Sequence, residues 1–105
     1  MNVTTKTKAI NSKLLFNQIN ELVKDGIYTV ELDWKSDEDR KVFVDFLNSM
    51  MHEFWEKGDI EQWKVQCNSL NNKTEDMING VFHLDIFFKQ KHCLNTSQIT
   101  YTILE

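Results

Sequence analysis

The sequence predicts an α+β domain in two layers, with two helices on a mostly antiparallel four-stranded sheet, in the order α-β-α-β-β-β. Residues 36–57 repeat apolar side chains with the period of a helix that buries one face. Several shorter segments instead alternate apolar and polar residues, which is typical of a strand with one buried face. The last three of these follow one another directly, and this favours an antiparallel meander.

The N-terminal part is predicted to hold a flexible segment and one helix. Residues 1–11 are polar and rich in Thr and Lys, so we expect a flexible N-terminus before a single domain at residues 12–105. Asn11 or Ser12 is a suitable N-cap. The apolar residues behind it recur at helical spacing: Leu15, Ile19, Leu22 and Val23. Gly26 suits the position just past a helix, so the helix should end there.

Residues 27–34 change the period and predict the first strand. Polar residues separate the apolar ones, which would share the buried face: Tyr28, Val30, Leu32 and Trp34. We expect this strand to join the sheet through the helix that follows it.

The long helix at residues 36–57 has the clearest end signals in the chain. Ser36 is an N-cap with acidic residues in the turn behind it, and Gly58 ends the helix after Lys57. The predicted buried stripe repeats every four residues and is widened by three neighbours: Val42, Phe46, Met50 and Phe54, with Phe43, Leu47 and Met51.

Three strands complete the sheet. Alternation predicts strands at residues 60–68, 81–91 and 99–103. Residues 69–80 carry turn formers and are predicted to be a loop that tucks Met77 and Ile78 against the core.

Composition excludes several classes of protein. The net charge of −4 argues against general binding of nucleic acid or of anionic membranes. No apolar run approaches the roughly 20 residues that span a bilayer. No secretory signal is present and two cysteines are too few for a disulfide framework, so we expect the cytoplasm of a host cell.

Catalytic and metal-binding motifs are missing from the sequence. His92 and Cys93 are adjacent rather than spaced as chelating ligands, and no phosphate-binding glycine loop is present. His83 and Asp85 share one strand face and could hydrogen-bond as a candidate catalytic pair, but such polar pairs are common on a solvated sheet, and an enzyme would also need a pocket beside them. We therefore expect no enzyme, no cofactor and no metal, with Cys67 a buried thiol.

The acidic residues are concentrated in one part of the chain. Residues 31–61 contain ten acidic and four basic residues, whereas the other segments contain six acidic and eight basic residues. Such a run is either a solvated face or a surface that docks on a basic partner. The residues that we expect to bind a partner combine these carboxylates with one aromatic side chain: Asp33, Asp37, Glu38, Asp39, Glu53, Trp55, Glu56, Asp59 and Glu61.

The segments KDGIYTVELDW and SDEDRKVFVDFL resemble small phage-encoded anti-CRISPR inhibitors of the type II RNA-guided nuclease. The match extends over about a third of the chain, and the matching residues within it are Lys24, Tyr28, Thr29, Val30, Leu32, Val42, Phe46 and Trp55. The chain departs from the family because its acidic helix directly follows the first predicted strand and the C-terminal acidic run is absent.

This resemblance implies a protein that blocks the DNA-binding region of the nuclease by DNA mimicry. We therefore expect an acidic inhibitor whose partner is a protein with a basic, nucleic-acid-binding surface, without direct contact to nucleic acid or membrane. The alternative is an adaptor or structural protein that forms a homodimer through its sheet, where Phe87 lies on the face opposite Phe82, Leu84 and Ile86.

Overall fold

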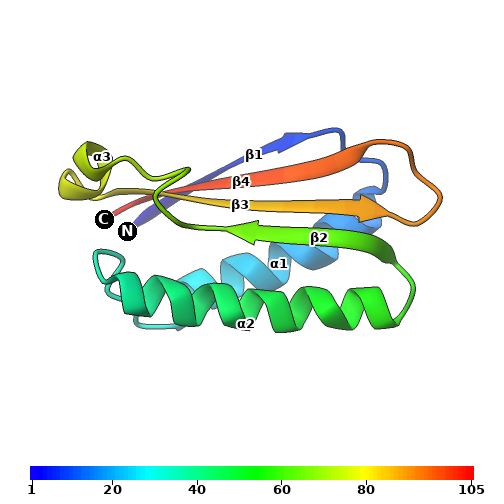
Figure 1. Cartoon of the computed structure of the whole chain (residues 1–105), viewed down its shortest axis with the longest axis horizontal. Coiled ribbons are helices and arrows are strands. Elements are labelled where there is room, and N and C mark those ends of the chain that lie inside the picture. The colour runs from blue at the N-terminus through cyan, green and yellow to red at the C-terminus, as the bar shows by residue number, and fades with distance from the viewer.

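The computed structural model describes all 105 residues and has an α+β fold, with three helices and a four-stranded antiparallel sheet (Figure 1). The elements are β1 (Asn2–Lys8), α1 (Lys13–Thr29), α2 (Asp37–Glu56), β2 (Ile60–Gln66), α3 (Thr74–Ile78), β3 (Val81–Gln90) and β4 (Thr96–Leu104). The strands lie in the order β1-β4-β3-β2. Helices α1 and α2 lie along the same face of the sheet, and α3 lies at one end (Figure 1).

The long helix confirms the prediction from its end signals. The side chain of Ser36 accepts a hydrogen bond of 3.2 Å from the backbone N–H of Asp39, as an N-cap does. At the other end, Gly58 has a φ of 82°, which glycine adopts without strain. These two ends give α2 the predicted length.

The buried stripe of α2 is narrower than predicted. Its buried apolar residues are Phe43, Leu47, Met50, Met51 and Phe54. Val42 and Phe46 were expected in the core, but both are exposed, and 49% of Phe46 is accessible. A helix that lies on a sheet covers a stripe of roughly 100°, so the side chains beyond that stripe face solvent.

The predicted first strand is wrong, because α1 continues through Gly26 and ends at Thr29. A Cβ atom on Gly26 would lie 3.3 Å from the ring of Phe43, so this glycine lets α1 and α2 approach closely. Val30 caps the helix by donating its N–H to the carbonyl of Gly26, and a loop leads from there to α2. Of the four residues predicted to share the buried face of that strand, only Trp34 is buried, while Ile27 is buried as part of α1.

The N-terminal segment, predicted to be flexible, instead forms edge strand β1 beside β4. Asn2 lies opposite Leu104, and Lys8 lies opposite Gln98. An edge strand can remain polar because neither of its faces is fully covered, and the β-branched threonines suit extended backbone. The element order is therefore β-α-α-β-α-β-β rather than α-β-α-β-β-β.

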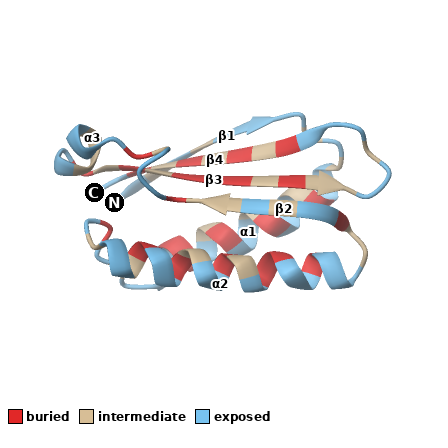
Figure 2. Ribbon diagram, in the orientation of Figure 1, coloured by how far each residue is buried: buried red, intermediate tan, exposed pale blue.

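The other three strands occur where predicted. Their apolar residues alternate toward the helices, and Figure 2 shows the buried positions concentrated along β3 and β4, the two central strands. The predicted loop at residues 69–80 contains the short helix α3. Within it Met77 packs against the core, whereas the predicted burial of Ile78 is wrong. No helix is long and apolar enough to cross a bilayer.

Candidate partner-binding surface

The predicted partner-binding residues occupy two separate clusters. The N-terminal cluster precedes and opens α2: Asp33, Asp37, Glu38 and Asp39. The C-terminal cluster closes the helix and begins β2: Glu53, Trp55, Glu56, Asp59 and Glu61. At 1.5 Å per residue, Asp37 and Glu56 lie about 28 Å apart along the helix. The structure therefore does not unite the predicted residues in one compact patch.

Most carboxylates of the N-terminal cluster hold the helix start in place. Asp39 accepts a hydrogen bond of 2.9 Å from the backbone of Asp33, and Asp33 accepts one of 3.1 Å from Lys35. Asp37 pairs with the buried guanidinium of Arg40 while remaining exposed itself. Glu38 is the one member of this cluster without such a contact.

The C-terminal cluster joins carboxylates to aromatic rings. Glu56 lies 2.7 Å from the imidazole of His52, and this imidazole stacks on Trp55 with ring centroids 5.3 Å apart. Trp55 is exposed and stacks on the same imidazole that pairs with Glu56, whereas Glu53 lies on the side of α2 that faces α1. Glu61 accepts a hydrogen bond from the backbone N–H of His92, and this bond is the main cause of its lowered pKa.

An exposed groove lies between the two long helices, and we call it the α1–α2 groove. Its lining residues come from both helices and the loop between them: Leu22, Asp25, Gly26, Thr29, Val30, Phe46, Ser49, Met50 and Glu53. Two of these residues are acidic and none is basic. The sequence did not indicate this groove, because Leu22, Val30 and Phe46 had been assigned to buried stripes.

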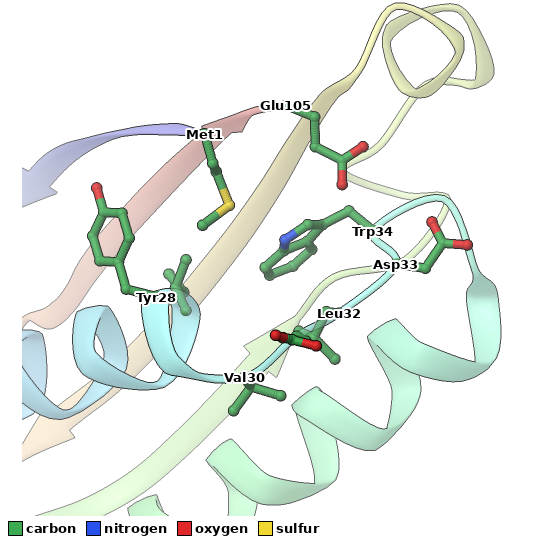
Figure 3. Close-up of a pocket in the computed structure, with 9 residues that line it drawn as sticks. Met1, Tyr28, Val30, Leu32, Asp33, Trp34 and Glu105 are labelled. Carbon is green, nitrogen blue, oxygen red and sulfur yellow. The ribbon is translucent and has the colours of Figure 1, made fainter.

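A second cavity, the Trp34 pocket, lies where the loop after α1 meets the two chain ends (Figure 3). Its volume is about 620 Å³. The lining combines apolar side chains with three carboxylates: Met1, Ile27, Tyr28, Val30, Glu31, Leu32, Asp33, Trp34 and Glu105. Val30 lines both this pocket and the α1–α2 groove, so the two hollows adjoin.

The indole of Trp34 is held rigidly in this pocket. Arg40, only 6% exposed, donates a hydrogen bond to the carbonyl oxygen of Trp34. The Trp34 ring meets Phe43 edge-on at 5.7 Å and lies 6.2 Å from Phe82. The sequence predicts Trp34 as a strand residue and gives no sign of its contact with Arg40, because no local pattern signals that contact.

The side of the sheet away from α1 and α2, called the open sheet face, is mainly polar. Its central residues come from all four strands: Lys6, Lys8, Lys64, Gln66, His83, Asp85, Phe87, Gln98 and Thr100. Asp85 accepts hydrogen bonds of 2.6 Å from Thr100 and 2.8 Å from Asn71. The imidazole of His83 instead lies 3.4 Å from the hydroxyl of Thr102. The candidate pair His83 and Asp85 thus has separate partners.

The two cysteines are free thiols in different surroundings. Burial raises the pKa of the Cys67 thiol to about 11, whereas Cys93 is partly exposed. No group of three or more His, Cys, Asp and Glu side chains is placed to hold a metal ion.

Comparisons of the chain with protein-family models, with curated proteins and with solved structures found no match.

Proposed function

We propose that this protein is a small, non-enzymatic inhibitor that binds a partner protein through the α1–α2 groove and the acidic residues beside it. The observation that carries this proposal is the exposure of Leu22, Val30 and Phe46 in a groove without a basic residue. Exposed apolar side chains that gather in a hollow are typical of binding surfaces. The carboxylates of Asp25 and Glu53 give this surface a negative rim.

The apolar side chains of the groove and the carboxylates around it would make different contributions to binding. Burial of Phe46 and its apolar neighbours would supply affinity, because hot spots are desolvated apolar or aromatic anchors. The surrounding carboxylates would steer the complex and select a basic partner, and salt would weaken this part of the interaction. The acidic clusters at the two ends of α2 would extend the negative surface along the helix.

The sequence resemblance suggests the DNA-binding region of a type II RNA-guided nuclease as the partner. In this proposal, exposed carboxylates such as Glu38, Glu53 and Glu56 would occupy places that DNA phosphates take in that region. Asp37 and Asp39 contribute to the helix start, so their reversal would disturb folding as well as charge. Glu53 is the more informative residue for a test.

The test compares two charge reversals of equal size by measuring binding to the purified nuclease with biolayer interferometry. Glu53→Lys changes the groove, whereas Glu75→Lys changes an exposed position on α3 that does not line the groove. We expect Glu53→Lys to weaken binding at least about tenfold and Glu75→Lys to leave it nearly unchanged. Equal effects of the two variants would contradict docking through the groove.

The open sheet face favours the homodimer as a second candidate function. Phe87 is half-buried there, between Lys64 on β2 and Gln98 on β4, and no helix covers it. A second copy could bury this ring. Sedimentation equilibrium of the wild type and of Phe87→Gln tests this candidate. A dimer that Phe87→Gln dissociates supports it, and a monomer at every concentration contradicts it.

A further inference from the structure

The Trp34 pocket has a chemical character of its own. Apolar side chains form most of its lining, and Glu31 and Glu105 add carboxylates without any basic side chain. The carboxylate of Asp33 instead accepts a hydrogen bond from the backbone N–H of Lys35 and points away from the Trp34 ring (Figure 3). Figure 3 shows the Trp34 ring at the centre, with Met1 and Tyr28 on one side and the Glu105 carboxylate near its opposite edge. An apolar cavity with a negative rim suits a group that is apolar along its length and cationic at its end.

A second feature of the pocket is the indole N–H of Trp34. The residue is only 2% exposed, yet its ring nitrogen faces the space beside Met1 and Tyr28, with no protein acceptor bonded to it (Figure 3). This nitrogen is not among the fully buried side-chain atoms that lack a hydrogen-bond partner, so solvent reaches it from the pocket. This donor is therefore available to an acceptor on a molecule that enters the pocket.

The pocket is also preorganised. The loop that carries Trp34 is fixed by the bond from Arg40 and by the contact of its ring with Phe43. Glu105 is held at the rim because its backbone N–H donates to the carbonyl of Gly80 at 2.9 Å. A ligand would meet these groups already in position, which lowers the entropic cost of binding.

From these observations we propose that the Trp34 pocket receives an arginine side chain of the partner protein, a proposal that depends on the proposed function. The aliphatic stem of arginine packs on Tyr28 and Leu32, and its guanidinium pairs with the rim carboxylates. The main-chain carbonyl of the same segment accepts the hydrogen bond from the Trp34 indole. Because the pocket adjoins the α1–α2 groove at Val30, one partner surface can reach both.

Arginine fits this site better than lysine for two reasons. Its planar guanidinium pairs with a carboxylate through two hydrogen bonds, and it stacks on aromatic rings such as Tyr28. An apolar side chain of similar length would fill the cavity but leave the carboxylates of Glu31 and Glu105 without a partner. The pocket should therefore discriminate by charge as well as by shape.

The first experiment uses a small probe and no partner protein. N-acetyl-arginine methylamide is titrated into ¹⁵N-labelled protein, while the Trp34 indole resonance is followed by NMR. The variants Trp55→Phe and Trp63→Phe assign that resonance by elimination, so Trp34 remains intact. We expect a saturable shift of the Trp34 indole N–H and a smaller response to N-acetyl-norleucine methylamide.

Variants at the rim make this experiment specific. Glu31→Gln keeps the size of the side chain and removes its charge, and should weaken binding of the arginine probe by about fivefold. Glu21→Gln removes one charge at an exposed site on α1 outside the pocket and should leave binding unchanged. Equal binding of the norleucine probe, or an unmoved Trp34 resonance, would overturn the proposal.

A second experiment tests arginine binding in the Trp34 pocket and partner docking through the α1–α2 groove independently of each other. Glu31→Gln and Glu53→Lys are both measured against the nuclease. If the arginine probe binds but Glu53→Lys keeps full nuclease affinity, the pocket is supported and groove docking fails. If Glu53→Lys abolishes nuclease binding and the probe leaves Trp34 unmoved, groove docking is supported and the arginine pocket is overturned.

Discussion

At the scale of single residues, Arg40 connects the start of α2 to the Trp34 pocket. Its guanidinium donates to the carbonyl of Trp34, lies 5.8 Å from the centre of the Phe82 ring and pairs with Asp37. The pair with Asp37 contributes little to stability, because that carboxylate is 94% exposed. The buried hydrogen bond and the packing of the guanidinium on Phe82 stabilise the fold more than this ion pair does.

Replacement of Arg40 by alanine should therefore destabilise the protein. The lost charge-assisted hydrogen bond, together with the buried carbonyl left without a donor, predicts a loss of about 2–4 kcal/mol. Urea denaturation measures this change. Lys41→Ala is the matched control, because the neighbouring side chain is 79% exposed and its removal should cost less than about 0.5 kcal/mol. Equal losses for the two variants would contradict the anchoring role of Arg40.

The two cysteines should react at different rates. Burial raises the pKa of the Cys67 thiol to about 11 and shields it, whereas Cys93 is partly exposed. Since the thiolate is the reactive form, a disulfide reagent at pH 8 should modify Cys93 rapidly and Cys67 only after unfolding. Absorbance of the released thiolate counts the fast equivalents, with Cys93→Ser as the control. Two fast equivalents would contradict the burial of Cys67.

The same thiol also predicts a loss of stability in alkaline solution. Folding raises the pKa of Cys67 from an ordinary value of 9.0 to about 11. The protonated thiol therefore contributes fully to the stability of the fold below pH 9.0, and this contribution is lost as the pH rises toward 11. Denaturation of Cys67→Ala between pH 8.5 and 10.5 should therefore show a shallower fall in stability than the wild type. Parallel curves would contradict this assignment.

At the scale of elements, the close contact of α1 and α2 depends on Gly26. A Cβ atom here would lie 3.3 Å from the ring of Phe43, which is itself buried against Trp34. Gly26→Val should cost about 1–3 kcal/mol through overpacking, more than the small gain from removing glycine from a helix. Asp25→Val, one residue earlier at an exposed position, is the control in thermal unfolding.

A second substitution checks the mechanism of that loss. If crowding of Phe43 is the cause, Phe43→Leu should cost less in the Gly26→Val background than in the wild type, because the smaller side chain relieves the crowding. Additive losses would contradict the crowding and would assign the effect of Gly26→Val to the helix alone.

The elements that the sequence predicted are those whose signals are local. The Ser36 cap and Gly58 define α2, and alternation alone places β2, β3 and β4. Residues 27–34 were wrongly predicted to form a strand because Gly26 looks in the sequence like a glycine that ends a helix. In the structure Gly26 lies inside α1 and lets it pack closely against α2. Strand β1 was missed because its partner is β4 at the other end of the chain, and its own pattern is polar.

At the scale of the whole molecule, the two layers present different chemistry. The helix layer exposes an apolar groove with carboxylates, whereas the open sheet face exposes lysines, amides and hydroxyls around Phe87. The acidity of residues 31–61 was visible in the sequence. The groove and the Trp34 pocket were not, because each is built by residues that only the fold brings together.

The most direct test of groove docking is displacement of DNA from the nuclease. Fluorescent target DNA is bound to the guide-loaded enzyme, and anisotropy is followed as the wild type, Phe46→Ala, Glu53→Lys or Glu75→Lys is added. We predict displacement by the wild type and Glu75→Lys, with both groove variants weakened at least about tenfold. Undiminished displacement by Phe46→Ala and Glu53→Lys, or no displacement by the wild type, would contradict the proposed inhibitor.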